Sequence, residues 1–493
     1  MLYKDFSSIF LTDFYNLTMS YAYWQKGLQN TEAIFHFNFR KNPFSGGFII
    51  FAGLETIVQY IVADQFLSNE NVEFLASQKD SEGKPLFDKE FILYLSTLNF
   101  NDCTIYAVKE GTVVFPFEPV IRVEGPIIKC QILETLFLNV IGFQSLIATK
   151  AARICMAAGE DEVIELGMRH AHGVDGALSA SRAAFIGGCV GTSNIIAGKE
   201  FGIPVKGTQS HSWIMFFGDE KKAFDEYSDV FTDNTFLVDT YSTMEGVNNA
   251  IFIGKQLQKV GKKLVAIRLD SGDLSYLSIK AREKLDAAGF SDTKIIVSNE
   301  LDEHIIASIK QEGCAIDCWG VGTKMVTGGE TSAASCVYKL AAIKKEDDTQ
   351  WQLKMKLSEQ VEKTSLPGKQ QVKRFYDRRA QQYIYDMVVS EFINEPYGQM
   401  HVIHSDVVIK IDKNLEVINL LEPITQGAKL VYNFPKLESL QMFVKQELKR
   451  LPTSLKRFIN PDYYKIGIES QLDKQQKDFI NSVKKRANDK NSA

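Results

Sequence analysis

The sequence predicts an α/β protein in which an irregular (β/α) barrel lies between an N-terminal α+β region and a C-terminal region. Three observations predict this fold. Short apolar runs alternate with helical stretches through the middle of the chain, polar or glycine-containing residues follow each run, and the composition shifts after about residue 345. Such alternation is typical of parallel strands joined by crossover helices. We expect domains at 1–160, 161–345 and 346–493.

The N-terminal region has the pattern of a sandwich-like α+β domain with long linking helices. In TEAIFHFNFR (31–40) apolar residues alternate, which predicts a strand with one apolar side. The segment 110–126 is rich in β-branched residues, glycine and proline, and predicts short strands and turns. The apolar stretch from Ile127 to about Ala158 predicts one long buried helix or two in succession.

The middle region supplies the predicted barrel strands, which are VIELGMR, VKGTQS, TFLVDTY, KLVAIRLD, KIIVSNE and CWGVGT. In KLVAIRLD, Val265, Ile267 and Leu269 share one side, whereas Arg268 and Asp270 share the other. A charged strand face fits the polar mouth of a barrel better than an open doubly wound sheet, which is apolar on both faces. In a barrel, the chemistry lies at the carboxyl ends of the strands. The C-terminal region is expected to pack on the other two.

Composition and charge narrow the class of protein. The 493 residues are 45% hydrophobic and 24% charged, which is typical of a soluble globular protein. The net charge of −5 argues against general nucleic-acid binding, so a phosphate site must be a local cluster. The seven cysteines lack zinc-site spacing and fit small core residues in a reducing compartment. MLYKDFSSIF lacks the core of a secretory signal, and no apolar run looks long enough to span a bilayer, so we expect a cytoplasmic protein without a membrane or nucleic-acid partner.

Several motifs occur in an order that closely resembles the nicotinate phosphoribosyltransferase family. They are LTDFYNLTMSYAYWQKG (11–27), ELGMRHAHGVDGALSASRAAFIGG (165–188), GTSNIIAGKEFGIPVKGTQSHSW (191–213), RLDSGDL (268–274), WGVGT (319–323) and LKRLPTSLKRFINPDYYKI (448–466). The resemblance covers nearly the whole chain. It implies the barrel of the type II phosphoribosyltransferases and the synthesis of nicotinate mononucleotide and diphosphate from nicotinate and 5-phosphoribosyl 1-diphosphate, the first step of NAD salvage from nicotinate. It also implies ATP as co-substrate, a phosphohistidine intermediate and Mg²⁺, so the enzyme is both a glycosyltransferase and a ligase.

The chemistry of that reaction decides which residues to expect. The pyridine nitrogen of nicotinate already has a free lone pair, so the nucleophile needs no general base. The reaction needs orientation of two anionic substrates and neutralisation of the charge on the departing diphosphate. A catalytic triad is therefore not expected.

Arg268 is the candidate for binding the nicotinate carboxylate. A guanidinium is a planar fork that matches a carboxylate, and Arg268 lies near the predicted carboxyl end of its strand. From spacing alone, the alternative is an internal ion pair with Asp270 or Glu165. The resemblance favours the substrate role.

Asp239 and Asp270 are the candidates for holding magnesium with the diphosphate, and the resemblance also gives Asp239 a catalytic role. Both follow apolar runs, and Mg²⁺ in proteins is commonly bound by one or two carboxylates together with phosphates and water. Asp273 precedes a helical run, so we expect it to cap that helix instead.

Arg169 ends VIELGMR, and the resemblance implies that it is a catalytic cation against the diphosphate. The alternative is an ion pair with Glu165 or Asp175. Here the chain departs from the commoner family pattern. Leu166 stands where an aromatic residue is expected, and His170 stands where arginine is frequent.

Two further substrate contacts follow from the resemblance. Tyr15 matches a nicotinate-contacting aromatic in an N-terminal segment that, in the family, reaches the site of the other subunit, which implies a homodimer with sites at the subunit interface. The alternative for Tyr15 is a core tyrosine. Thr323 and Gly322 in WGVGT suit the 5′-phosphate, because backbone amides in a glycine-rich turn bind phosphate. The alternative for these two residues is a plain tight turn.

The segment VKGTQSHSW (205–213) matches the family at Thr208, a nicotinate contact, and at His211, the phosphorylated histidine. A neutral imidazole is a good nucleophile near neutral pH. Because the two residues are three apart, a regular strand would point them to opposite sides, so we expect the strand to end or bulge near Gln209 or Ser210. The alternative for His211 is a structural hydrogen-bonding histidine.

Three other functions are weighed against this one. A nicotinamide phosphoribosyltransferase uses an acidic residue near the GT turn, where this chain has Ser193 and Asn194. A quinolinate phosphoribosyltransferase is shorter, needs more basic residues for a second carboxylate and phosphorylates no histidine. A catalytically silent relative would bind nucleotides or a partner without turnover, and an activity assay separates it from the enzymes.

Overall fold

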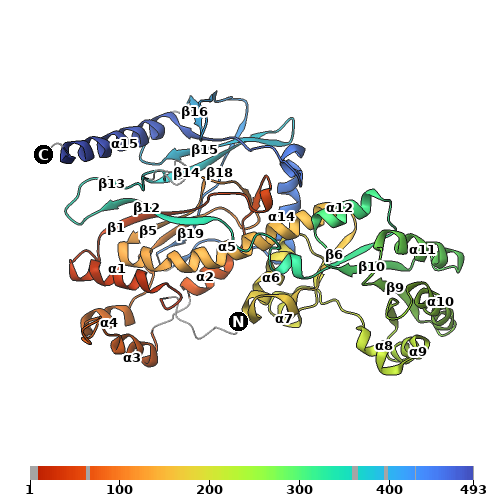
Figure 1. Ribbon diagram of the computed structural model, residues 1–493. Helices are drawn as coiled ribbons and strands as arrows, with labels where there is room; N and C mark the ends of the chain where they lie inside the picture. Colours follow the sequence, from red (N-terminus) through yellow and green to blue (C-terminus); the bar gives the residue numbers. More distant parts are fainter. Residues whose placement is uncertain (1–8, 63–66, 358–364, 394–397, 428, 492–493) are drawn as a thin grey trace. The chain divides into compact units, whose positions relative to one another are not determined.

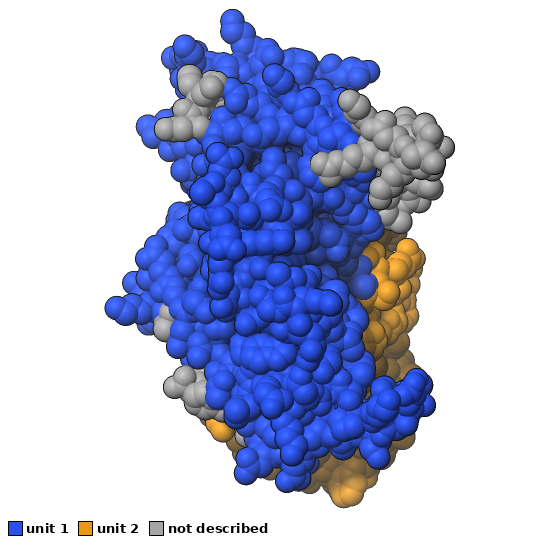
Figure 2. Space-filling model, turned by 90° about the vertical axis from the view of Figure 1, so that its left-hand side faces the viewer, with its two compact units in different colours: residues 1–146, 333–493 blue, residues 147–332 orange. Residues whose placement is uncertain are grey.

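The computed structural model describes residues 9–62, 67–357, 365–393, 398–427 and 429–491. Most of the N-terminal segment that bears on a secretory signal lies outside them, as does 358–364 in the C-terminal region. The chain forms two compact units, Met1–Leu146 with Ala333–Ala493 (unit 1) and Ile147–Ser332 (unit 2). Figure 2 colours the two units separately. The three domains expected from the sequence stay a prediction.

Unit 1 contains a seven-stranded antiparallel sheet in the order β13-β12-β1-β5-β3-β19-β20. Its strands are β1 (Glu32–Phe39), β3 (Thr104–Ala107), β5 (Pro119–Pro126), β12 (Cys336–Lys344), β13 (Gln352–Leu353), β19 (Glu422–Gln426) and β20 (Lys429–Leu430). Helices α1 (Phe14–Gln25), α2 (Leu54–Val62) and the first part of α5 (Ile127–Ala158) lie along one face (Figure 1). Apolar side chains from this face and these helices, such as Phe35, Phe37 and Leu133, share one core.

The second sheet of unit 1 has six strands in the order β17-β16-β21-β15-β14-β18. They are β14 (Gln370–Asp377), β15 (Gln382–Ser390), β16 (Gln399–Val402), β17 (Val408–Lys410), β18 (Glu416–Asn419) and β21 (Ile466–Glu469). The short pair β2 (Ile49–Ile50) and β4 (Val113–Val114) and the helices α3 (Asn69–Ser77), α4 (Lys89–Ser96), α14 (Leu437–Arg450) and α15 (Ser470–Asn491) complete the unit. The second sheet lies over the face of the seven-stranded sheet that is opposite α1 and α5 (Figure 1). His36, on that face of β1, is buried.

Unit 2 is built on a curled sheet of six parallel strands in the order β7-β6-β11-β10-β9-β8. The strands are β6 (Glu162–Glu165), β7 (Gly191–Thr192), β8 (Asp233–Leu237), β9 (Lys263–Leu269), β10 (Lys294–Asn299) and β11 (Cys318–Val321). The helices are α6 (Gly173–Gly187), α7 (Ile195–Phe201), α8 (His211–Phe217), α9 (Glu220–Val230), α10 (Thr243–Lys259), α11 (Leu274–Ala287), α12 (Glu303–Gln311) and α13 (Thr323–Val326). The predicted α/β alternation is confirmed. β7 and β8 are the two edges of this sheet, so the strands form part of a barrel wall.

The segment VKGTQS differs from the expected strand. Val205 makes a single parallel bridge to Thr192, and the chain then runs without regular structure until α8 begins at His211. The residues between are small and polar, so they lack the apolar alternation that would hold a longer strand against the sheet.

The predicted long helix is one element, α5, which begins directly after Pro126. The expectation that no apolar run could span a bilayer is wrong, because α5 is long and apolar enough by length and composition. However, 72% of its most apolar window is buried inside the protein, which is the pattern of a core helix in a soluble protein. None of the seven cysteines, all of which lie in the described ranges, forms a disulfide.

A buried charge cluster in unit 1 holds the second sheet to neighbouring segments. Arg374 on β14 donates to Asp386 on β15 through Nη2 (2.7 Å) and Nε (3.0 Å). Its guanidinium also lies 3.6 Å from a Glu447 carboxylate oxygen and 3.8 Å from Glu118 Oε1. Burial, together with the nearby Asp386 carboxylate, raises the pKa of Glu118 well above its usual value. Glu118 therefore holds its proton to higher pH than an exposed glutamate does.

Glu118→Gln is expected to stabilise the protein increasingly as the pH rises. The pKa of Glu118 is higher in the folded than in the unfolded protein, so its stabilising contribution is complete below the unfolded pKa and is lost as the pH rises through the folded pKa. Thermal unfolding is measured from about pH 5 to about pH 9. The melting temperature of the variant minus that of the wild type should increase across this range. Glu82→Gln, on an exposed turn, is the control. A constant difference across this range would contradict the assignment.

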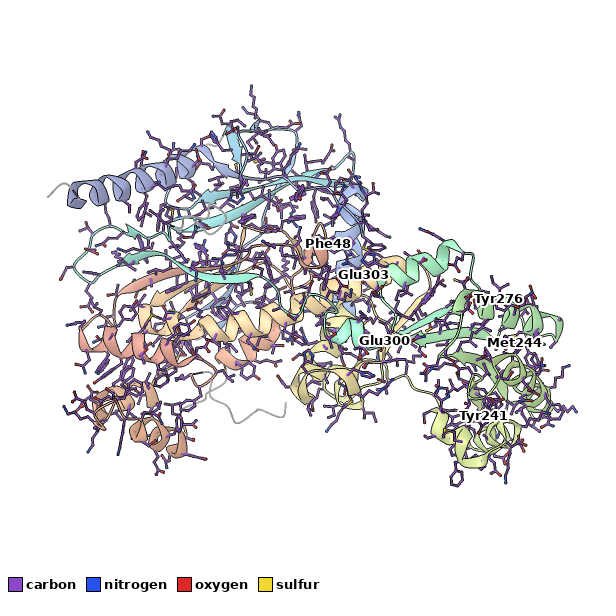
Figure 3. All side chains as sticks on the ribbon, viewed as in Figure 1. Phe48, Tyr241, Met244, Tyr276, Glu300 and Glu303 are labelled. Atoms are coloured by element: carbon purple, nitrogen blue, oxygen red, sulfur yellow. The ribbon has the colours of Figure 1, made fainter. Side chains whose placement is uncertain are left out.

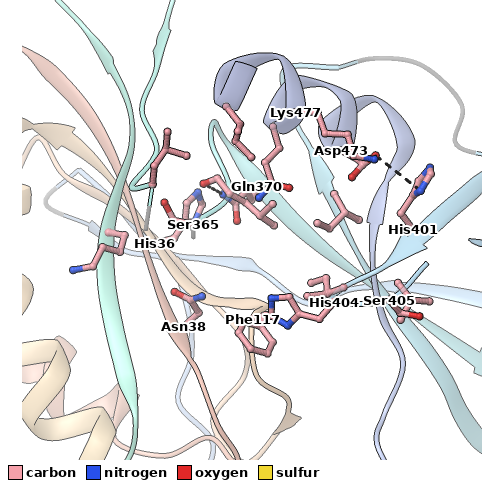
Figure 4. Close-up of a pocket in the computed structure, with 18 of the residues that line it drawn as sticks. His36, Asn38, Phe117, Ser365, Gln370, His401, His404, Ser405, Asp473 and Lys477 are labelled. Atoms are coloured by element: carbon pink, nitrogen blue, oxygen red, sulfur yellow. Dashed lines mark hydrogen bonds and ion pairs between the residues drawn. The ribbon is translucent and has the colours of Figure 1, made fainter. Parts of the chain in front are cut away.

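Unit 1 also contains a cavity of about 1030 Å³ between the two sheets and α15 (Figure 4). His36 Nε2 donates to the backbone oxygen of Gly368 (3.0 Å), and burial lowers the pKa of His36 to about 3, so the ring is neutral. Near α15, Asp473 pairs with Lys477 (2.6 Å) and lies 3.9 Å from His401. None of the predicted site residues lines this cavity.

Candidate functional site

The candidate site is built on one edge of the parallel sheet of unit 2, where the carboxyl ends of the strands meet. Strand pairing aligns Leu237 with Arg268 and Asn299 with Val321, so the residues that follow β8, β9, β10 and β11 emerge along the same edge. The polar residues of these strand ends can therefore converge on one ligand.

Arg268 lies near the end of β9 and is largely buried, with its guanidinium held from two sides. Nε donates to the hydroxyl of Ser298 (2.8 Å), and Nη2 donates to Asp270 Oδ1 (2.8 Å). Nη1 makes only long contacts, to Thr208 Oγ1 (3.4 Å) and to the backbone oxygen of Gln209 (3.5 Å). The ion pair with Asp270 that spacing offered as an alternative is thus present, while the Nη1 side is the one that an incoming carboxylate can engage.

Asp270 connects Arg268 to His211. Its Oδ1 accepts hydrogen bonds from Arg268 and Ser298, and its Oδ2 lies 3.6 Å from His211 Nε2. Burial alone would raise the pKa of Asp270, but the Ser298 hydrogen bond and the Arg268 charge lower it below the usual value. The carboxylate therefore stays ionised beside the imidazole.

His211 is the first residue of α8, and its ring is partly exposed. Nδ1 lies 3.1 Å from the hydroxyl of Thr240, and Nε2 faces Asp270. The ring is therefore oriented on both nitrogens by groups from the ends of β8 and β9, so the histidine of SHSW and the arginine of RLDSGD meet in one place.

Asp239 follows β8 and faces the β9–α11 turn. Its Oδ2 accepts from the backbone amide of Asp270 (2.9 Å) and from the hydroxyl of Ser271 (2.6 Å). Its Oδ1 is buried and has no hydrogen-bond partner in the described part of the chain. An orphaned carboxylate oxygen of this kind fits a hard cation. Asp273 accepts from the Tyr276 amide and caps α11, as predicted.

Arg169 lies in the short turn Met168–His170 that follows β6, and its side chain is exposed. Among the described residues it forms no ion pair with Glu165 or Asp175, and its role stays a prediction. Leu166 packs against the end of β11, where a Cβ on Gly320 would overlap its side chain.

Thr323 begins α13 directly after Gly322, and its hydroxyl donates to Glu300 (3.0 Å). Glu300, which is labelled in Figure 3, follows β10. Gly322 precedes Thr323, and its backbone is packed closely against Leu166, because an added Cβ would lie 3.2 Å from the Leu166 backbone oxygen. The turn thus brings an amide-rich segment to the same edge, although the glycines also serve close packing.

Tyr15 belongs to unit 1, on α1, and is not the core residue that its amphipathic context offered as an alternative, since its side chain is 48% exposed. Burial of the rest of the ring and the nearby Glu134 raise the pKa of its hydroxyl. The phenol is therefore neutral and available for contact at its exposed face.

Three family models match the chain in order. They are the N-terminal domain of nicotinate phosphoribosyltransferase over residues 10–142, the nicotinate phosphoribosyltransferase family over 162–384, and the C-terminal domain over 369–476. The chain is 38% identical to a nicotinate phosphoribosyltransferase of Bacillus subtilis, over 98% of this chain and 97% of that protein. The chain belongs to the nicotinate phosphoribosyltransferase family.

Other members agree with this assignment. A nicotinate phosphoribosyltransferase of Caenorhabditis elegans is 34% identical over 94% of this chain and 91% of its own length. The crystal structure of human nicotinic acid phosphoribosyltransferase superposes with a TM-score of 0.81 at 27% identity, over 95% of this chain and 99% of that one. The chain is thus an enzyme of the nicotinate phosphoribosyltransferase type with the fold of that family. Its substrates are nicotinate and 5-phosphoribosyl 1-diphosphate, and its reaction is the NAD salvage step.

The structure adds three side chains that the sequence did not single out. Ser298 bridges Arg268 and Asp270, Thr240 contacts His211, and Glu300 contacts Thr323. Each is a polar residue at the carboxyl end of a predicted strand, in KIIVSNE or TFLVDTY. That position was the available signal, since the rule that located Arg268 and Asp239 applies equally to these residues.

Proposed function

We propose that this nicotinate phosphoribosyltransferase couples its reaction to ATP hydrolysis through a phosphohistidine at His211, with Mg²⁺ held at Asp239 and Asp270 and with Tyr15 completing the site of a partner subunit. The observation that carries this proposal is the connection from His211 through Asp270 to Arg268. Because the His211 imidazole and the Arg268 guanidinium share one carboxylate, this contact supports giving them roles in a single site.

Nicotinate binds with its carboxylate on Arg268 Nη1 and the Thr208 hydroxyl. These two groups make only a long contact with each other at 3.4 Å, so both can turn to a ligand. A charged hydrogen bond of this kind is about twice as strong as a neutral one. The pyridine nitrogen then attacks C1 of the phosphoribosyl donor as the bond to diphosphate breaks. The leaving group takes the bonding electron pair, and the exposed Arg169 neutralises part of its charge.

His211 accepts the phosphoryl group of ATP. One ring nitrogen attacks the γ-phosphorus, the bond to ADP breaks, and a nitrogen–phosphorus bond forms. Asp270, ionised beside Nε2, stabilises the positive charge that the ring gains. Water later attacks the phosphorus, releases phosphate and restores the imidazole, so ATP and water become ADP and phosphate in each cycle. The 5′-phosphate of the donor lies on Gly322 and Thr323.

The carboxylates of Asp239 and Asp270 fit a divalent cation, because Asp239 Oδ1 is buried and without a partner among the residues described. Bound Mg²⁺ would neutralise the diphosphate and orient it for departure. Asp239 holds its own place through the Asp270 amide and the Ser271 hydroxyl. These contacts therefore fix the Asp239 carboxylate with the lone pairs of Oδ1 left for a cation.

The exposure of Tyr15 supports the proposed homodimer. A half-exposed tyrosine on an N-terminal helix is free to contact a ligand or another chain. Leu166, directly after β6, stands where an aromatic residue is expected, so an aromatic ring from elsewhere is needed to stack on the pyridine. The proposal gives this role to Tyr15 of a partner subunit.

The activity is tested by incubating the purified protein with nicotinate, 5-phosphoribosyl 1-diphosphate, Mg²⁺ and ATP. Nicotinate mononucleotide should form, and ADP should accumulate with it. Parallel reactions with nicotinamide or quinolinate in place of nicotinate should give little product, since Ser193 and Asn194 occupy the GT turn. If product forms without any ATP hydrolysis, the transferase activity stands, but the proposed coupling to ATP hydrolysis is wrong. No product from any of the three would favour the silent relative.

His211→Ala is expected to abolish stimulation by ATP while slow, ATP-independent transfer remains, because the phosphoryl acceptor is lost and the nicotinate contacts are kept. Radiolabelled γ-phosphate from ATP should label the wild type with an acid-labile bond, and it should not label this variant. His304→Ala, on α12, is the matched control and should label normally. Full ATP coupling in His211→Ala would remove His211 from its role.

A further inference from the structure

Glu165 is a fully buried carboxylate that the proposed reaction does not use. It is the last residue of β6, and its side chain is 1% exposed. Oε2 accepts hydrogen bonds from Thr192 Oγ1 (2.5 Å) and Ser181 Oγ (2.8 Å), and Oε1 accepts one from the backbone amide of Gly167. Within the described ranges, these three donors are its side-chain partners, and none of them is a lysine, arginine or histidine. Three neutral donors therefore hold one buried carboxyl group.

These donors come from three segments that meet at the edge of the sheet. Thr192 ends β7, Ser181 lies on α6, and Gly167 opens the turn that carries Arg169. Thr192 Oγ1 also accepts from the amide of Asn194 (2.9 Å). The Glu165 carboxylate is thus the common acceptor of two segments at the carboxyl edge of the sheet, the Leu166–Arg169 turn and the GT turn.

The backbone around Glu165 has little freedom to adjust if the carboxylate is changed. The Glu165 carbonyl accepts from the Ser193 amide (2.9 Å), and the Leu166 amide donates to Val321 (2.8 Å). A Cβ on Gly167 would overlap Val326 of α13, so the turn passes as close to α13 as a backbone can. The hydrogen bond from the Gly167 amide to Glu165 therefore fixes where the next residues of the turn begin.

We propose that Glu165 is a positioning residue for the anionic substrate. Its carboxylate sets the Leu166–Arg169 turn against the GT turn, and it thereby fixes the place from which Arg169 reaches the diphosphate. This inference rests on the proposed role of Arg169. Arg169 has no side-chain partner among the residues that the structure describes, so its aim depends on the backbone of its turn, and the Gly167–Glu165 hydrogen bond is what anchors that turn to β6.

A buried carboxylate without a cationic partner is a costly way to fill a core position, because its desolvation is only partly offset by neutral donors. An apolar residue there would take this acceptor from the Gly167 amide and from the Thr192 and Ser181 hydroxyls, of which Ser181 keeps the Ala177 backbone oxygen (2.9 Å). The carboxylate has enough lone pairs to serve all three donors at once. The arrangement is thus explained by the geometry it imposes on two binding segments.

The test compares Thr192→Val with Thr192→Ser. The valine variant keeps the shape of the side chain and removes the donor, whereas the serine variant keeps the donor. Binding of inorganic diphosphate in excess Mg²⁺ is measured by isothermal titration calorimetry, and KM for 5-phosphoribosyl 1-diphosphate and kcat are measured beside it. We expect Thr192→Val to raise the Kd for diphosphate and this KM roughly tenfold. Thr192→Ser should stay within about twofold of the wild type.

A purely structural role predicts another result, namely a lower melting temperature and a smaller active fraction, with Kd and KM unchanged in the protein that remains folded. That result would overturn the inference. Where Thr192→Val does not fold, Ser181→Ala removes a second donor of the same carboxylate and is read in the same way.

Arg169→Ala separates this inference from the proposed function. If Arg169→Ala weakens diphosphate binding and Thr192→Val does not, the inference about Glu165 fails alone. If Arg169→Ala leaves the Kd for diphosphate unchanged, the role proposed for Arg169 fails, and the inference that depends on it fails too.

Discussion

Arg268→Ala is expected to raise KM for nicotinate by roughly a hundredfold, because removing one partner of a buried charged pair costs about 2–5 kcal/mol. The guanidinium is held by Ser298 and Asp270, which leaves Nη1 for the contact proposed with the nicotinate carboxylate. The alanine variant loses that contact and also leaves the Asp270 carboxylate without its ion pair. Steady-state kinetics with nicotinate varied at saturating ATP measure the effect.

Two comparisons separate a carboxylate contact from general damage to the site. KM for ATP should change far less than KM for nicotinate, since the guanidinium is assigned to nicotinate alone. Arg268→Lys keeps the charge but cannot hold Ser298 and Asp270 while facing a ligand, so its KM for nicotinate should fall between those of the wild type and the alanine variant. Equal changes in both KM values would count against the contact.

Arg374→Met is expected to cause the largest loss of stability in unit 1. Arg374 is 1% exposed, and its removal leaves the buried Asp386 carboxylate without its cation and leaves Glu447 with Arg450 alone. Breaking a buried ion pair from one side typically costs about 3–5 kcal/mol. The guanidinium also lies 4.7 Å from the ring centre of Tyr383, so packing is lost with the charge. Thermal unfolding should show a fall in melting temperature on the order of 10 °C.

Arg378→Met is the matched control, because it removes an arginine from the neighbouring turn. Arg378 pairs with Glu416 at 2.7 Å but is 75% exposed, and exposed ion pairs contribute about 0–1 kcal/mol. Its melting temperature should therefore stay close to that of the wild type. A similar fall in melting temperature in the two variants would contradict the claim that burial makes the Arg374 ion pairs important for stability.

The site was predictable from the sequence to the extent that strand periodicity governs it. Alternation in KLVAIRLD predicted that Arg268 and Asp270 share a face, and they form an ion pair there at 2.8 Å. The position of Asp273 before a helical run predicted the cap that it forms on α11. These features depend on local geometry, which the order of residues determines directly.

Features that depend on contacts between distant residues could not be predicted. Ser298 meets Arg268 from thirty positions away, and a serine at a strand end has no pattern of its own. His36 is buried although alternation placed it opposite the apolar side of β1, because Gly368 and its neighbours cover that face. The core helix α5 is long and apolar, and only its burial within the protein distinguishes it from a membrane span.

A crystal structure of the protein with nicotinate bound tests the central claim most directly. The account predicts that the nicotinate carboxylate lies within hydrogen-bond distance of the Arg268 guanidinium and of Thr208, in the same site as the His211 ring. Nicotinate bound at another place, or bound here with its carboxylate turned away from Arg268, would contradict it.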